Sequence, residues 1–131
     1  MTGELPVRRR GAGFTLIELL VVMAIVALLL TIAMPRYFQS VDVARESALV
    51  QTLKASREAI DLYYRDKGRY PDSLQELVDA KYLRGLPRDP LTESNTTWVL
   101  VPPPTDAKGL LYDLKSGAPG VNRDGRPFSE L

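Results

Sequence analysis

The N-terminal part of the chain contains a long, almost entirely apolar run from Phe14 to Met34. An α-helix rises 1.5 Å per residue, so about twenty apolar residues are enough to span the hydrocarbon core of a bilayer. The pattern therefore predicts a transmembrane helix over residues 14–35. Three polar residues interrupt the run: Thr15, Glu18 and Thr31.

Beyond Met34 the apolar residues keep a helical spacing, which predicts that the same helix continues to about Asp66. Gly68 is expected to end it, because glycine readily adopts the left-handed conformation that closes many helices. Pro35 should kink the helix, since proline removes one main-chain hydrogen bond and clashes with the preceding turn. The apolar positions form two adjacent faces, one with Tyr37, Val41, Ala44 and Ala48, the other with Leu49, Leu53, Ile60 and Tyr64. The charged positions are expected to face water or neighbouring subunits: Asp42, Arg45, Glu46, Lys54, Arg57, Glu58 and Asp61.

The rest of the chain predicts one short helix and two strands. Asp72 is expected to cap the helix, with Gln75 three residues later in a capping-box arrangement, and the helix should run to about Ala80. Residues 96–101 and 110–114 are rich in β-branched, aromatic and leucine side chains, which favours an antiparallel pair of strands. Two strands alone are marginally stable, so the sheet should lean on the long helix. The expected fold class is α+β.

A carboxylate inside a membrane helix needs an explanation. An ionised acid near a bilayer centre costs roughly 2.5–3.5 kcal/mol on insertion scales, so Glu18 is a functional hypothesis by default. No small-residue cleavage site follows Met34, but the small pair Ala12-Gly13 precedes the apolar run. Cleavage between Gly13 and Phe14 would keep the helix and create a new α-amino group four residues from Glu18. That amine could neutralise the carboxylate.

The leader is basic and indicates the orientation of the helix. Its arginines are Arg8, Arg9 and Arg10, with Glu4 as the only acid. By the positive-inside rule, they place the N-terminus in the cytoplasm and the rest of the chain outside.

The six residues from Gly13 to Glu18 resemble the type III signal of prepilins and pseudopilins. The resemblance implies cleavage after Gly13 by a prepilin peptidase, N-methylation of Phe14, and pairing of Glu18 with the N-terminus of a neighbouring subunit. Proline is common in this family at the position of Pro35. The implied organisation is a cleaved leader over residues 1–13, a transmembrane and filament-core helix over 14–35, and a periplasmic head over 36–131.

The resemblance is closest to the major pseudopilins of type II secretion. It implies a single-pass protein of the bacterial inner membrane that polymerises into a periplasmic helical filament and drives protein export. The implied partners are further copies of the chain, prepilin peptidase, minor pseudopilins, an inner-membrane assembly platform and a secretin. The alternatives are a type IV pilin or minor pilin for motility, adhesion or DNA uptake, and a membrane-tethered enzyme or sensor.

Charge and composition narrow the range of functions. The 131 residues include 17 basic and 16 acidic side chains, and loss of the leader would leave 14 against 15, a balance that argues against nucleic acid as a partner. The chain has no cysteine and no histidine, so it is not a disulfide scaffold and lacks the commonest acid–base residue. The sequence contains no phosphate loop, no nucleophile elbow and no cluster of Cys and His. We expect no enzymatic activity.

The C-terminal segment is the one candidate for a ligand. It gathers oxygen-bearing residues around Gly117, Gly120 and Gly125, and oxygen is the ligand that Ca²⁺ prefers. The major pseudopilins have a calcium site in their C-terminal loop, and the present segment resembles it in part. The resemblance implies four candidate ligands: Leu114, Ser116, Asn122 and Asp124. Nearby cations weaken this expectation, and Asn122 and Asp124 serve equally well as turn formers.

Overall fold

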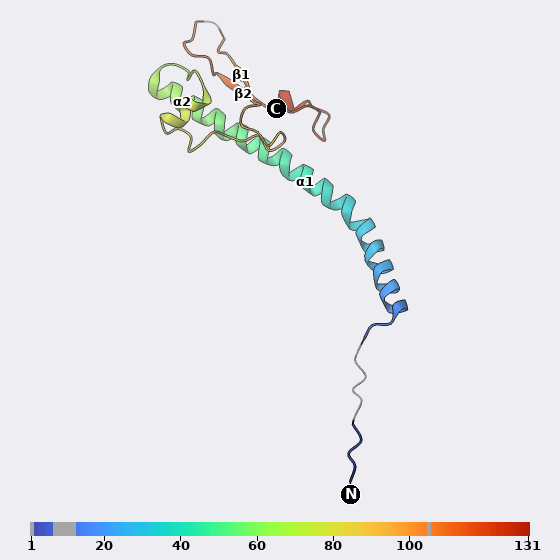
Figure 1. Ribbon diagram of the computed structural model, residues 1–131. Helices are drawn as coiled ribbons and strands as arrows, with labels where there is room; N and C mark the ends of the chain where they lie inside the picture. Colours follow the sequence, from blue (N-terminus) through green and yellow to red (C-terminus); the bar gives the residue numbers. More distant parts are fainter. Residues whose placement is uncertain (1, 7–12, 105) are drawn as a thin grey trace. The chain divides into compact units, whose positions relative to one another are not determined.

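The computed structural model describes residues 2–6, 13–104 and 106–131. The chain divides into two compact units, Met1–Gln39 and Ser40–Leu131, and one long helix contributes to both. The expected α+β class, with a long N-terminal helix and a small antiparallel sheet, is confirmed. The leader residues Arg8, Arg9, Arg10 and Ala12 lie outside the described residues. In chain order the elements are α1 (Leu16–Lys67), α2 (Leu74–Asp79), β1 (Val99–Val101), β2 (Asp113–Lys115) and the 3₁₀ helix η1 (Phe128–Glu130) (Figure 1).

Helix α1 is continuous from the apolar run into the second unit. It includes Pro35 without interruption and ends at Lys67, one residue beyond the expected end. Gly68 then takes φ +71°, and its N–H donates to the carbonyl of Tyr64 at 2.8 Å. A side chain is strained at such a φ, so glycine closes the helix as predicted. The kink at Pro35 stays a prediction.

The core of the second unit forms between α1 and the segments that follow it. Leu49, Leu53 and Ile60 of α1 are buried, as their spacing predicts. Tyr63 is also buried, whereas Tyr64 was expected on this face but is 43% exposed and stacks on Tyr70 with ring centroids 4.4 Å apart. The core partners from the rest of the chain are Leu74, Leu77, Trp98, Leu111 and Leu114.

Helix α2 starts one residue later than predicted. Its N-cap is Ser73, whose Oγ accepts a hydrogen bond from the N–H of Glu76 at 3.2 Å, so the assignment of Asp72 as cap is wrong. The Glu76 carboxylate in turn accepts from the N–H of Asp72 at 2.7 Å. Gln75, the expected box partner, instead donates to Asp79 at 2.9 Å. The capping logic holds, but Glu76 rather than Gln75 is the residue that reaches back.

The two strands pair antiparallel, with Val99 opposite Lys115 and Leu100 opposite Leu114. Both are shorter than predicted. The N–H groups of Leu110 and Leu111 donate to the carbonyl of Pro71 rather than to β1, so this part of the expected strand is tied to the start of α2. Main-chain hydrogen bonding to a third segment therefore displaces the second strand to residues 113–115.

Asp89 is a fully buried acid that the sequence indicated only as part of a loop. Its carboxylate accepts hydrogen bonds from the N–H of Leu91 at 2.8 Å and from the hydroxyl of Ser116 at 2.6 Å. These bonds satisfy the buried charge and tie the loop before β1 to the segment after β2.

Candidate functional site

The N-terminal site is built on the first turn of α1. Gly13 and Phe14 precede the helix and are exposed, and Thr15 stands immediately before its first residue. The Thr15 hydroxyl accepts a hydrogen bond from the N–H of Glu18 at 3.1 Å, and its carbonyl accepts from the N–H of Leu19 at 3.1 Å. Thr15 is therefore the N-cap of α1.

This cap places Glu18 in the first turn of the helix. A negative charge is stabilised there, because the unpaired N–H groups at the start of a helix carry partial positive charge. The structure thus brings Phe14, Thr15 and Glu18 together at one helix end. The role of Thr15 was missed, although the spacing Thr15-x-x-Glu18 is that of a capping box and could have indicated it.

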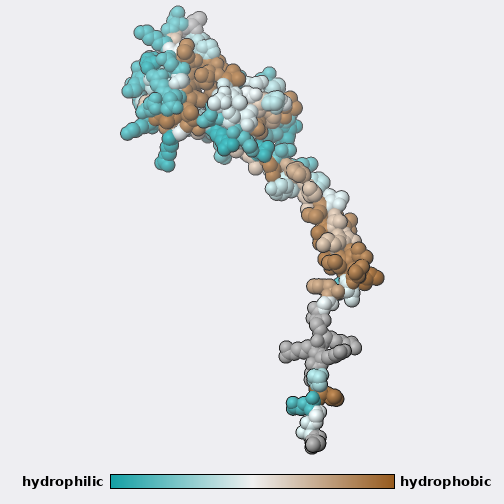
Figure 2. Space-filling model, in the orientation of Figure 1, coloured by the Kyte–Doolittle hydropathy of each residue, from teal (hydrophilic) through white to brown (hydrophobic). Residues whose placement is uncertain are grey.

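The apolar part of α1 is exposed along its whole length. Within the described residues, α1 is the one helix long and apolar enough to cross a membrane, and none of its apolar window is buried in the fold. Figure 2 shows this hydrophobic surface on the first unit. A contiguous apolar surface of this extent marks a membrane or protein contact rather than a surface that faces water. The exposed side chains include Leu19, Leu20, Met23, Ile25, Leu28, Leu29 and Ile32.

The predicted calcium ligands are engaged by the protein itself. The Leu114 carbonyl accepts a hydrogen bond from the Arg57 guanidinium at 3.0 Å. The Ser116 hydroxyl donates to Asp89 and accepts from the N–H of Ala118 at 3.1 Å.

The other two predicted ligands lie in a turn. The Asn122 side-chain oxygen accepts from the N–H groups of Asp124 and Arg126, at 3.0 and 2.9 Å. Asp124 is exposed. Asn122 therefore has the turn-forming role that was the alternative to metal binding. In residues 2–6, 13–104 and 106–131, no group of three or more acids forms that could hold a metal. Leu114, Ser116 and Asn122 thus use their candidate oxygens in hydrogen bonds within the protein, and calcium binding stays a prediction.

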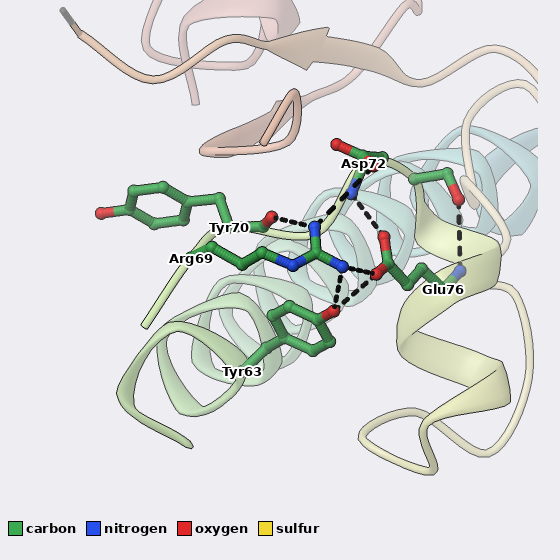
Figure 3. Close-up of polar contacts among 6 residues, drawn as sticks. Tyr63, Arg69, Tyr70, Asp72 and Glu76 are labelled. Carbon is green, nitrogen blue, oxygen red and sulfur yellow. Dashed lines mark hydrogen bonds and ion pairs between the residues drawn. The ribbon is translucent and has the colours of Figure 1, made fainter. Parts of the chain in front are cut away.

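A second polar cluster joins α2 to α1 (Figure 3). The Tyr63 hydroxyl donates to the Glu76 carboxylate, and the Arg69 guanidinium donates to both Glu76 and the Tyr63 oxygen. The N–H of Asp72, the Tyr63 hydroxyl and Arg69 hold the pKa of Glu76 below its usual value. The hydrogen bond to Glu76, together with burial, raises the pKa of Tyr63.

Each of these shifts favours the protonation state that the group already has at neutral pH. Neither shift moves the pKa of Glu76 or Tyr63 toward 7, where a catalytic acid or base would exchange its proton. The cluster therefore has a structural role: it fixes the turn after α1 and the start of α2.

Comparison with known proteins gives two kinds of match. Residues 8–34 match the family described as the prokaryotic N-terminal methylation motif. The chain is 30% identical over 123 residues to the type II secretion system core protein G of Escherichia coli K12, covering 82% of this chain and 81% of that protein. It is 34% identical over 98 residues to the core protein G of Klebsiella pneumoniae, covering 63% and 70%.

A pilin also matches, with less of its length covered. The type IV major pilin protein PilE1 of Neisseria gonorrhoeae is 31% identical over 97 residues, which are 74% of this chain and 46% of the pilin. No solved structure gives a significant match.

Proposed function

The chain belongs to the family of type II secretion system core protein G and is a pseudopilin, and from this premise we propose how it is processed and assembled. A prepilin peptidase cleaves after Gly13, Phe14 is N-methylated, and mature chains polymerise into a periplasmic filament. The observation that carries the proposal is the capped first turn of α1, which places Glu18 four residues after Phe14 at the end of an exposed apolar helix.

The apolar helix requires an environment that the chain does not provide. Burial of apolar surface stabilises by about 25 cal/mol per Å², so a bilayer or other helices must cover this surface. In the inner membrane, lipid covers it. In a filament, the equivalent helices of other copies cover it. Assembly exchanges one apolar environment for another. Apolar burial alone therefore contributes little to the free-energy difference between the membrane-inserted chain and the filament.

Glu18 supplies a free-energy difference that favours the filament. Cleavage exposes an α-amino group at Phe14, and the cap at Thr15 holds Glu18 in the adjacent turn. In lipid, the carboxylate carries the cost of a charge in an apolar medium. When the methylated amine of one chain meets Glu18 of the next, the two opposite charges neutralise each other, and the filament becomes the favoured state.

The remaining partners follow from the family and are part of the same proposal. They are the prepilin peptidase, minor pseudopilins, the inner-membrane assembly platform and the secretin. The chain acts as a structural subunit without an enzymatic activity of its own. The pilin alternative has less support, because the chain covers 46% of the Neisseria pilin against 81% of the Escherichia coli core protein.

The test is a pair of variants in the same helix. Glu18→Ala should be cleaved, methylated and inserted normally, but should form no filaments when produced with the other components of a secretion system. Thr31→Ala is the control, because within the described residues the Thr31 hydroxyl donates to the Ala27 carbonyl of its own helix, at 2.8 Å. It should assemble as the natural chain does.

Three measurements distinguish the steps. Mass spectrometry reports cleavage and methylation at Phe14, membrane fractionation reports insertion, and electron microscopy of sheared material reports filaments. Normal filaments from Glu18→Ala would refute the pairing with the amine. An unmodified N-terminus in the natural chain would refute the processing.

A further inference from the structure

Arg57 is a charged residue of α1 whose side chain donates three hydrogen bonds to the C-terminal segment. Its Nε donates to Asp113 Oδ1 at 2.7 Å, and its Nη2 donates to the main-chain oxygens of Leu114 at 3.0 Å and Leu131 at 2.7 Å. Both members of the Arg57–Asp113 ion pair are partly buried. Arg57 therefore connects the second half of α1 to β2 and to the residue that follows η1.

The three oxygens around Arg57 are of the kind that bind hard cations. They are one carboxylate oxygen and two main-chain oxygens, and Ca²⁺ is commonly bound by such a mixture. One of them, the Leu114 carbonyl, is also among the four oxygens that the sequence predicts as calcium ligands. A guanidinium already occupies the site.

A calcium ion and this guanidinium would compete for the same oxygen. Calcium binds at 2.3–2.6 Å from its ligands, so an ion on Leu114 would lie beside a positive charge 3.0 Å from the same atom. Like charges at such a separation repel, and the partly buried site screens them less than bulk water would. The hydrogen bond of Ser116 to the buried Asp89 removes a second predicted ligand.

We propose that Arg57 takes the role of a metal ion in this fold: its guanidinium is the cation that holds the C-terminal segment on α1, and the head is stable without calcium. The planar fork of an arginine suits this role. It donates from two nitrogens at once in a fixed geometry, whereas a lysine offers a single compact charge.

The test measures folding and does not depend on filament formation, so it can fail while the proposed function stands. The full chain is purified in detergent, and its melting temperature is followed by the fluorescence of Trp98, the one tryptophan. Measurements are made with chelator and with millimolar CaCl₂. A ligand that binds only the native state must raise the melting temperature. Because we expect no calcium to bind, the two melting temperatures should agree within about 1 °C.

Variants test the role of the guanidinium directly. Arg57→Met keeps much of the aliphatic volume and should lower the melting temperature by about 5 °C or more, because Asp113 is left without its partner. Arg57→Lys should lie between Arg57→Met and the natural chain. The matched control is Arg65→Met, which alters an exposed arginine of the same helix and should change the melting temperature by no more than about 1 °C.

Two results would overturn the proposal. One is a calcium-dependent rise of several degrees in the natural chain, or sensitised luminescence from Tb³⁺, a probe of calcium sites, that added Ca²⁺ quenches. The other is an Arg57→Met variant as stable as the Arg65→Met control. If Arg57→Met fails to fold, hydrogen exchange of the natural chain decides: protection of residues 113–116 should be the same with chelator and with CaCl₂.

Discussion

The two units of this chain are stabilised in different ways. In Met1–Gln39, the apolar side chains of α1 are exposed, and none of the apolar window is buried by the chain itself. In Ser40–Leu131, apolar side chains of the same helix are buried in a core that includes Leu53, Ile60 and Leu77. One helix thus has an exposed apolar surface in the first unit and contributes to the buried core in the second. The comparison separates a stretch of α1 that packs into the core of the head from a stretch whose apolar side chains stay exposed.

The largest expected effect on the stability of the head comes from replacing a buried isoleucine by alanine, compared with the same substitution in the first unit. Ile60 is fully buried, whereas Ile25 is 52% exposed. Ile60→Ala should reduce the free energy of unfolding of the head by about 2–5 kcal/mol, because it removes core contacts and leaves a cavity. Ile25→Ala should leave the head unchanged.

Thermal unfolding of both variants in detergent, followed by Trp98 fluorescence, measures this difference. Equal melting temperatures for the two variants would show that the units are not independent in the way described here. A filament assay on Ile25→Ala then reports the contribution of the apolar surface to assembly.

The second prediction concerns acid, and it applies to the head alone. The N–H of Asp72, the Tyr63 hydroxyl and Arg69 lower the pKa of Glu76 in the folded state below its usual value of 4.5. The unfolded chain therefore binds a proton at Glu76 more readily than the folded chain. The stability that these contacts provide is present above pH 4.5 and is lost as the pH falls through the lowered pKa.

Melting temperatures between pH 7 and pH 3 measure this loss, with Glu76→Gln as the comparison. The variant should be less stable than the natural chain at pH 7, and the difference should narrow toward pH 3. A constant difference across this range would contradict a role for the ionised carboxylate. Because the cluster lies in the head, acid should act on the head through Glu76 without any involvement of Glu18.

The smallest effect is expected at the N-cap of α1. Thr15→Ala removes the hydroxyl that accepts the N–H of Glu18 and should cost about 0.5–2 kcal/mol, confined to the first turn. Thr15→Ser keeps the acceptor and serves as the control. The melting temperature of the head should not change in either variant.

Amide hydrogen exchange in detergent checks this prediction residue by residue. The amide of Glu18 should exchange faster in Thr15→Ala than in Thr15→Ser or the natural chain. Equal protection in all three would show that the cap has no energetic role at this helix end.

Much of the fold was predictable because it depends on local patterns. Helix α1 and its end at Gly68, the existence of α2, and the antiparallel pair of strands all follow from spacing, capping and β-propensity. The boundaries were harder to predict. Asp72 and Ser73 are both good caps, and only the attachment of Glu76 to Arg69 and Tyr63 shows which one is used.

The candidate sites divide in the same way. The signal from Gly13 to Glu18 could be recognised directly, since it consists of six consecutive residues. Arg57 could not be distinguished from the other charged residues of α1, because its partners are 56 or more positions away in the chain. Asp89 was equally hidden, since its hydrogen-bond partner Ser116 is 27 positions away in the chain.

The sequence by itself determined that this chain has a membrane-length apolar helix, a match to the prokaryotic N-terminal methylation motif and an acid in the first turn of that helix. Such features follow from composition and from neighbours within four residues. Only the tertiary structure decided which tyrosine enters the core, where the strands begin, and which group neutralises Asp113. These outcomes depend on contacts between segments that are distant in the chain. Such contacts form only when the chain folds around its core, so local sequence patterns do not predict them.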